Sequence, residues 1–216
     1  MLEVSINMDI PTLIKFEKQI SKLYEDGLIR GPVHLRDGNE KQLVDIFKSI
    51  NPEDYVFSTW ANHLHALLKG IPAKNVKDRI LESQSMAMNF PEYRFFTSAI
   101  VGGIPSIAIG TAISIKRNRD QNRVWCFLGD MAFRSGIAHE SIMYAISNSL
   151  PITFVIEDNE KSVDTPTQNA WGIVDILEIF EFYYSLILKY QSTCGIMYYK
   201  YKLSYPHSGT GTFVEF

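Results

Sequence analysis

Two polar residues, Asp130 and Asn159, stand 29 positions apart, and each comes just after an apolar run. Asp130 follows VWCFL and Gly129, while Asn159 follows ITFVI and the pair Glu157-Asp158. If both runs are neighbouring strands of one parallel sheet, their carboxyl ends lie at the same edge, where such sheets bind ligands. A carboxylate and an amide oxygen suit Mg²⁺, which completes its shell with water and phosphate oxygens. The spacing therefore suggests a site for Mg²⁺ and a diphosphate.

A helix expected to begin near Ser135 and Gly136 strengthens this interpretation. The start of such a helix directs free backbone N–H groups at the same edge, which favours a bound phosphate. An alternative stays open, because Asp and Asn are both common in turns and at helix N-caps. On spacing alone, the two readings are about equally supported.

The elements that must position these residues alternate along the chain. Helical spacing or caps predict helices at 11–26, 40–50, 62–70, about 104–116, 136–148 and 173–182. Strand-like runs lie at 55–59, 123–128, 152–156, 186–190 and 196–203. Alternation of this kind predicts an α/β fold, in which helices cover both faces of a parallel sheet. With no internal repeat or linker, we expect a single domain over residues 1–216.

Composition excludes several classes of protein. A chain of 216 residues with 46% hydrophobic residues can bury a sizeable core, and a net charge of −3 argues against nucleic acid or an anionic membrane as partner. Cys126 and Cys194 form no CxxC, so we expect reduced thiols and a cytoplasmic location. No basic segment precedes an apolar stretch at the N-terminus, which argues against a secretory signal. Residues 95–115 carry no charge, but glycines and Pro105 dilute them, so a buried loop and helix is expected rather than a membrane span.

Read as one motif, Gly129-Asp130-Met131 through Glu157-Asp158-Asn159 resembles the cofactor motif of a known family. That family is the α subunit of thiamine-diphosphate-dependent E1 enzymes of the 2-oxo acid dehydrogenase type, and the resemblance covers about residues 12–167, with a shorter match at the C-terminus. The resemblance implies Asp130 and Asn159 as side-chain ligands of Mg²⁺ and Lys161 as a ligand through its backbone carbonyl. It also places Gly129, Met131 and Ala132 against the cofactor.

Four further stretches match the family in order and spacing. GLIRGPVHLRDGNE would bring His34 to the substrate, and INPEDYVFSTWANHLHALLKG would bring Trp60 to the diphosphate and His63 to the reaction. SAIVGGIPSIAIGTA would lay Ile100, Val101 and Gly102 along the thiamine. SYPHSGTGTFVEF resembles the family's tail, which makes His207 an interface or site candidate. His65 lies two positions from His63, so the two cannot share a helix face, and a packing or surface role is expected for it.

The sequence also departs from the family. Met131 replaces a glycine of the motif, so a side chain stands where the backbone normally approaches the cofactor. The arginine that faces the diphosphate falls on Ala61, Trp60 replaces a tyrosine, and a histidine falls on Ala87. The chain is also short.

The resemblance implies that this chain forms only part of the active site and that a β subunit completes it. The glutamate that activates the cofactor comes from a β subunit, so an α2β2 assembly is expected, acting on a 2-oxo acid with a lipoyl carrier as a candidate acyl acceptor. Two alternatives stay open: a split transketolase-like subunit, and a non-catalytic E1α-like subunit that stabilises a partner. The sequence does not define the 2-oxo acid, the acyl acceptor or the β partner.

Overall fold

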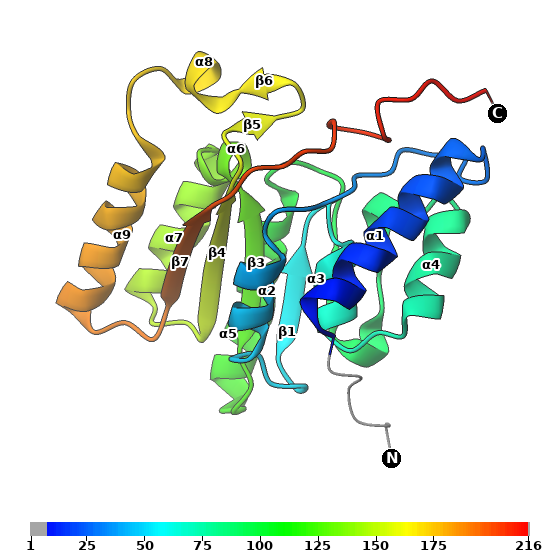
Figure 1. The fold of residues 1–216 in the computed structure, drawn as a ribbon. Helices are drawn as coiled ribbons and strands as arrows, with labels where there is room; N and C mark the ends of the chain where they lie inside the picture. The colour runs from blue at the N-terminus through cyan, green and yellow to red at the C-terminus, as the bar shows by residue number, and fades with distance from the viewer. Residues whose placement is uncertain (1–7, 216) are drawn as a thin grey trace.

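The computed structural model describes residues 8–215, and its centre is one parallel sheet. The strand order is β2 (Phe95–Thr97), β1 (Tyr55–Ser58), β3 (Val124–Gly129), β4 (Ile152–Asp158) and β7 (Gly195–Lys200). All four pairings between these strands are parallel. The carboxyl ends of the strands therefore lie along one edge, which is uppermost in Figure 1.

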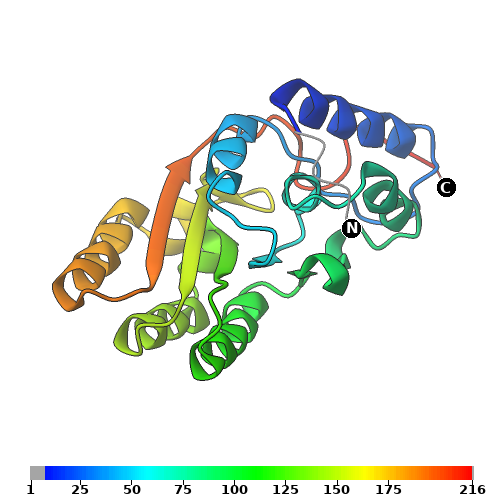
Figure 2. The same ribbon diagram turned by 90° about the horizontal axis from the view of Figure 1, so that it is seen from below.

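Helices cover both faces of the sheet, as expected for the predicted α/β class (Figures 1 and 2). One face carries α1 (Ile10–Glu25), α2 (Glu40–Phe47), α3 (His63–Leu68) and α4 (Ala73–Leu81). The other carries α5 (Gly103–Asn118), α7 (Gly136–Ser147) and α9 (Ile176–Tyr190). The predicted fold class is confirmed, while the prediction of a single domain over residues 1–216 stays a prediction.

Strand β3 shows how the sheet separates two hydrophobic clusters. Trp125 and Phe127 belong to the cluster under α1–α4, while Val124, Cys126 and Leu128 belong to the cluster under α5, α7 and α9. Successive side chains of a strand point to opposite faces, so a continuous apolar run fills both clusters. This is why VWCFL could be recognised as a buried strand from the sequence.

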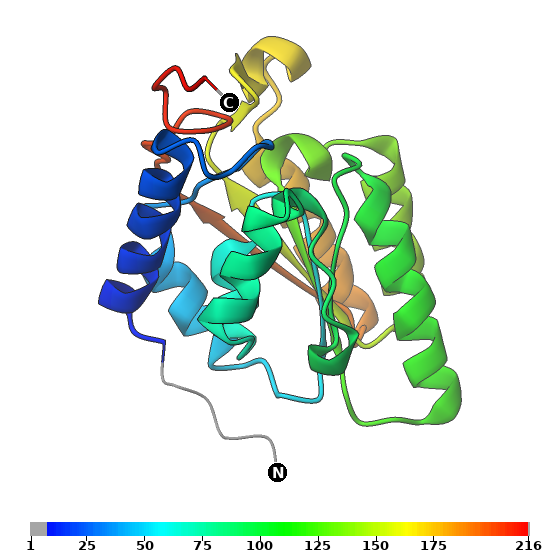
Figure 3. The same cartoon turned by 90° about the vertical axis from the view of Figure 1, so that its right-hand side faces the viewer.

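Short elements gather above the carboxyl edge. Helix α6 (Asp130–Phe133) follows β3 directly, and the hairpin of β5 (Lys161–Ser162) and β6 (Thr165–Pro166) follows β4. Helix α8 (Thr167–Trp171) closes the hairpin segment. Figures 1 and 3 show this hairpin and the C-terminal segment that follows β7 lying above the same edge of the sheet.

One predicted strand is wrong. Residues 186–190 form the last turns of α9 and not a strand. The buried and half-buried side chains of this helix recur every three or four positions and face the second cluster; they are Ile176, Ile179, Phe180, Tyr183, Leu186 and Ile187. That spacing is the signature of a helix, and the apolar residues on the outer side of α9 obscured it.

Other elements were not predicted. Helix α4, strand β2 and the β5–β6 hairpin were not expected from the sequence, and neither were the 3₁₀ turns Ser85–Ala87 and Pro91–Tyr93. The uncharged stretch 95–115 forms β2, a Gly-rich loop and most of α5, in agreement with the expected loop and helix. Between residues 8 and 215, we find no helix with the length and apolar character needed to cross a bilayer.

Candidate functional site at the carboxyl edge of the sheet

A cavity opens where the carboxyl ends of β3 and β4 meet. The two strands pair so that Gly129 lies opposite Glu157, which brings the segments after them side by side. The cavity and its open mouth together hold about 1090 Å³ of space, part of which is open solvent. Its walls come from segments far apart in the chain, among them residues 34–36, 59–61, 98–101, 129–132, 161–164 and 205–207.

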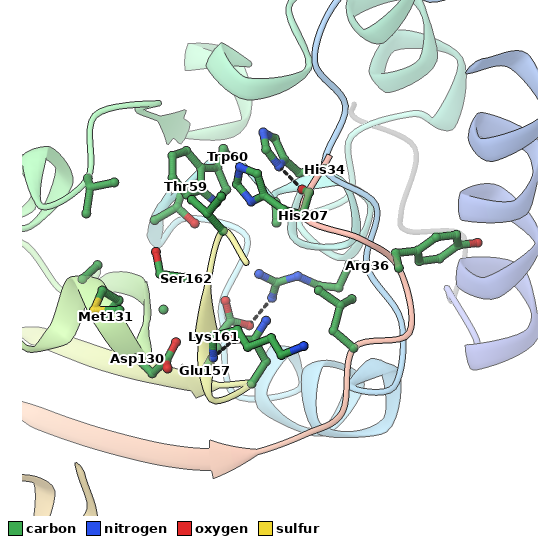
Figure 4. Close-up of a pocket in the computed structure, with 18 of the residues that line it drawn as sticks. His34, Arg36, Thr59, Trp60, Asp130, Met131, Glu157, Lys161, Ser162 and His207 are labelled. Carbon is green, nitrogen blue, oxygen red and sulfur yellow. Dashed lines mark hydrogen bonds and ion pairs between the residues drawn. The ribbon is translucent and has the colours of Figure 1, made fainter. Parts of the chain in front are cut away.

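Most of the residues predicted for the site line this one cavity. They are His34, Trp60, Ile100, Val101, Gly129, Asp130, Met131, Ala132, Asn159 and Lys161. Figure 4 shows how several of them face the same space. Two predicted residues, Gly102 and His63, do not line it. Their assigned roles stay predictions, and the structure gives them other neighbours.

Gly102 follows the cavity-lining residues Ile100 and Val101 but does not line the cavity itself. It is the N-cap of α5 and has a left-handed backbone, with φ of +73°. A Cβ atom at this position would lie 2.9 Å from Cγ2 of Ile137 and 3.2 Å from Oγ of Ser135, at the start of α7. The glycine therefore allows the α5 and α7 N-termini to approach each other beneath Ile100 and Val101.

His63 lies in a separate buried network. Its Nε2 is 2.8 Å from Oγ of Ser85, and its Nδ1 is 3.2 Å from Oε1 of Glu17. All three side chains are buried. This network joins α1, α3 and the turn that carries Met86, so the contacts of His63 are structural.

Asp130 is one of the carboxylates that line the cavity, together with Glu157 and Asp164. It begins α6, is buried, and accepts a hydrogen bond from the hydroxyl of Thr167. Burial raises the pKa of Asp130 from 3.8 to about 6, and the charge of Asp158 adds to this, while the bond from Thr167 acts in the opposite direction. A cation placed beside this carboxylate would relieve the cost of its buried charge.

Asn159 organises the hairpin that follows β4. Its Oδ1 accepts a hydrogen bond of 3.1 Å from the backbone N–H of Lys161, which is the turn role that the sequence left open. The backbone N–H of Thr167 donates to the carbonyl of Glu160 at 2.9 Å. Together with the bond from Thr167 to Asp130, these contacts hold the hairpin against the start of α6.

The carboxylate of Asp130 and the amide oxygen of Asn159 are ligand types that Mg²⁺ uses, and both side chains line the cavity. Within residues 8–215, no group of three or more His, Cys, Asp or Glu side chains gathers as a metal site. A cation here would therefore depend on the Asp130 carboxylate, the Asn159 amide oxygen and a backbone carbonyl. Mg²⁺ accepts few protein oxygens and keeps water or phosphate oxygens for the rest, so the residues present fit it.

Met131 finds a partner at the position where the family resemblance expects glycine. It lies in α6 and lines the cavity, and its sulfur accepts a hydrogen bond of 2.9 Å from the indole N–H of Trp171. Trp171 belongs to α8, so the methionine links α6 to the segment that closes the hairpin.

His34 and Trp60 stack at another wall. Their rings lie 5.2 Å apart at 19°, and Nδ1 of His34 donates to the carbonyl of His207 at 2.5 Å. The other ring nitrogen of His34 lies 3.0 Å from the sulfur of Met86. Burial lowers the pKa of His34 to about 4, so it is neutral near pH 7. Figure 4 shows His34 beside His207, the tail residue that the sequence singled out.

A buried charge pair that was not expected from the sequence lies in the same cavity. Arg36 donates to Oε1 of Glu157 at 2.5 Å, and the same oxygen accepts from Tyr199 at 2.5 Å and lies 3.1 Å from Nε2 of His65. Oε2 of Glu157 has no hydrogen-bond partner among the described residues. Although burial disfavours its charge, Arg36 and His65 hold the pKa of Glu157 well below its ordinary range.

A signal for this pair was present in the sequence. Glu157 ends a run of apolar residues, where an ionised carboxylate needs a buried partner. Arg36 stands 121 positions away, and nothing local marks it as that partner. His65 is fully buried and bonds Ser58 at 2.7 Å, so its expected packing role holds and a surface role does not.

The fold and the cavity define an α/β protein with a cavity beyond the carboxyl ends of its parallel strands, and comparison with known proteins gives the family. The family model of the dehydrogenase E1 component matches residues 8–178. The chain belongs to the dehydrogenase E1 component family.

Relatives in the family include named E1 α subunits. The chain is 29% identical over 179 residues to pyruvate dehydrogenase E1 component subunit alpha of Porphyra purpurea, a match that covers 74% of this chain and 52% of the relative. It is 28% identical over 165 residues to the alpha subunit of acetoin:2,6-dichlorophenolindophenol oxidoreductase of Bacillus subtilis, covering 72% and 50%. The chain thus spans about half the length of these curated relatives.

A solved structure shares the fold. It is an X-ray structure from Mycobacterium smegmatis described as a thiamin diphosphate-dependent enzyme, with a TM-score of 0.51 and 16% identity. The similarity covers 78% of this chain and 32% of that one. At this identity the match shows a common fold and nothing more specific.

Proposed function

We propose that this chain is the α-type subunit of a thiamine-diphosphate-dependent 2-oxo acid dehydrogenase. The observation that carries the proposal is the meeting of Asp130, Asn159 and Lys161 at one cavity, formed by neighbouring parallel strands. Membership of the dehydrogenase E1 component family and the names of the relatives support the same reading.

In this proposal the chain holds the diphosphate end of the cofactor through Mg²⁺. Asp130 gives a carboxylate oxygen, Asn159 gives its amide oxygen and Lys161 gives its backbone carbonyl. The chemistry that thiamine diphosphate supplies when bound is a nucleophilic carbon and an electron sink for decarboxylation. Ile100, Val101 and Met131 contribute apolar walls to the cavity.

His34 serves this site as a neutral group. With a pKa of about 4 it carries no charge near pH 7, and its Nδ1 proton is held by the carbonyl of His207. It therefore orients the Trp60 wall and the tail segment, and acts on a substrate only as a neutral hydrogen-bonding partner.

We further propose a β subunit as partner, in an α2β2 assembly, with a 2-oxo acid as substrate and a lipoyl carrier as acyl acceptor. The E1 α names of the relatives support the β partner. A non-catalytic role for the chain is the outcome that the following test would reveal.

The test is a calorimetric titration of thiamine diphosphate, with Mg²⁺ and with a chelator instead. Wild type should bind with Mg²⁺ and lose most affinity with the chelator, and Asp130→Ala should behave with Mg²⁺ as wild type does without it. Asp45→Ala, which changes an exposed carboxylate far from the cavity, should match wild type. Absence of Mg²⁺-dependent binding in wild type, alone and with a co-purified β subunit, would contradict the proposal.

A further inference from the structure

We propose that the side-chain ammonium of Lys161 is the cation with which this chain holds the terminal phosphate of its diphosphate ligand. The inference rests on the proposed function and deepens it, since the role implied for Lys161 so far involves only its backbone carbonyl. Three features support it: the charges around the cavity, the contacts of Lys161 and the element that carries it.

The cavity has few positive charges to offer an anion. Among the described residues that line it, the Lys and Arg side chains are Arg36 and Lys161. Arg36 is buried and its charge is neutralised by Glu157 at 2.5 Å. His34 is neutral near pH 7, because burial lowers its pKa to about 4. Ala61 also lines the cavity and carries no charge.

The side-chain ammonium of Lys161 is not engaged by another described residue. In the part of the chain that the structure describes, its ammonium takes part in no ion pair within 4 Å and in no side-chain hydrogen bond. Glu160, its neighbour in the chain, is paired instead with Lys200 at 2.6 Å. Asp164 lines the same cavity but forms no ion pair with Lys161 within that distance. An anion entering the cavity therefore meets a free ammonium.

The hairpin keeps this ammonium near the proposed Mg²⁺ site. Lys161 pairs with Pro166 across the two short strands, and the next residue, Thr167, donates its hydroxyl to Asp130. The backbone N–H of Lys161 is held by Asn159. The backbone of Lys161 is thus bonded to Asn159 directly and linked to Asp130 through the paired strand and Thr167, and its side chain lines the same cavity. Figure 4 shows Lys161, Asp130 and Glu157 at the same side of the cavity.

The experiment compares binding constants for Mg²⁺-thiamine diphosphate, measured by calorimetry, among charge variants. Lys161→Met should weaken binding by about tenfold to a hundredfold, the range expected for a charge-assisted hydrogen bond to phosphate. Lys161→Arg keeps the charge and should stay within about threefold of wild type. Lys189→Met, which removes an exposed lysine of α9 outside the cavity, should leave binding unchanged.

Thiamine without its diphosphate is the second probe. Lys161→Met should leave the binding of thiamine unchanged, because the ammonium acts on the phosphate. An equal loss for both probes would overturn the inference, since it would indicate a distorted cavity. Binding of thiamine diphosphate by Lys161→Met within about threefold of wild type would also overturn it and leave the proposed function intact. Absence of binding in wild type, alone and with a co-purified β subunit, would instead contradict the proposed function itself.

Discussion

At the scale of single residues, Glu157 is the group of the site whose buried charge depends most on its partners. One of its oxygens faces three donors, Arg36, His65 and Tyr199, while the other has no partner among the described residues. A buried carboxylate held in this way depends on its cation, because removing one partner leaves an uncompensated charge.

Arg36→Met should therefore lower the free energy of unfolding by about 3–5 kcal/mol at pH 7. Lys41→Met, which breaks the exposed ion pair with Asp45, should cost less than about 1 kcal/mol. Urea denaturation of wild type, Arg36→Met and Lys41→Met measures both changes in the free energy of unfolding. Adding Glu157→Leu to Arg36→Met should recover much of the loss, since no buried charge then remains. Equal losses for the two single variants would show that the buried pair is not needed for stability.

Asp130 gives a prediction about pH. Its folded pKa is raised by burial to about 6 from 3.8, so between these values the unfolded state ionises while the folded state keeps its proton. Stability that this group contributes at low pH is therefore lost as pH rises from about 4 to about 6. Asn does not titrate, so metal-free Asp130→Asn should gain on the order of 2 kcal/mol relative to wild type between pH 4 and pH 7. Urea midpoints at both pH values test this, and a gain in the opposite direction would contradict it.

Residues of the site differ in how far the sequence alone could reveal them. Asp130 and Asn159 were recognisable because each follows its own apolar strand, and a polar residue at a parallel strand end is a local pattern. The Arg36–Glu157 pair joins positions 121 apart, and its signal exists only after the sheet forms. Met131 was recognised as a side chain in place of a glycine, but its contact with Trp171 of α8 depends on where the hairpin lies.

At the scale of elements, the junction of α5 and α7 sets the wall that carries Ile100 and Val101. The backbone of Gly102 has a left-handed φ, and a Cβ atom there would lie 2.9 Å from Ile137, so the junction has no room for a side chain. Gly102→Ala should lower the free energy of unfolding by about 1–3 kcal/mol, through backbone strain and overpacking.

Gly110→Ala in the same helix is the matched control. Nothing lies within 4 Å of a Cβ at Gly110, so alanine there should stabilise the protein by up to about 1 kcal/mol. Urea midpoints of the two variants measure the expected loss of stability for Gly102→Ala and the expected gain for Gly110→Ala. A loss in both variants would show that α5 tolerates no added side chain anywhere, and would contradict a special role for Gly102.

Helices and strands were predictable from the sequence where a single pattern of apolar residues dominated the segment. Strands β3 and β4 are short, apolar and followed by polar residues, and both were found. The sequence predicts a strand over residues 186–190, the end of α9, because Leu188 and Tyr190 are apolar although exposed, which hides the buried stripe of the helix. Strand β2 has only three residues and is recognised by its pairing with β1, which the sequence does not show.

At the scale of the whole molecule, the two hydrophobic clusters share the strands that separate them. Trp125 fills one cluster and its neighbour Cys126 fills the other, and β4 divides its side chains in the same way through Val155 and Ile156. A change in either cluster therefore acts on the same strands. The predicted single domain should unfold as one cooperative unit.

Two core substitutions test this cooperativity. Leu64→Ala acts in the cluster under α1–α4 and Ile142→Ala in the cluster under α5, α7 and α9, and both side chains are fully buried. Each should lower the free energy of unfolding by about 2–5 kcal/mol. In each variant, urea midpoints from tryptophan fluorescence and from far-UV circular dichroism should move together, because loss of either cluster unfolds the shared sheet. If one variant moved the midpoint of only one signal, the two faces would be separate folding units, and the carboxyl-edge cavity would lie between them.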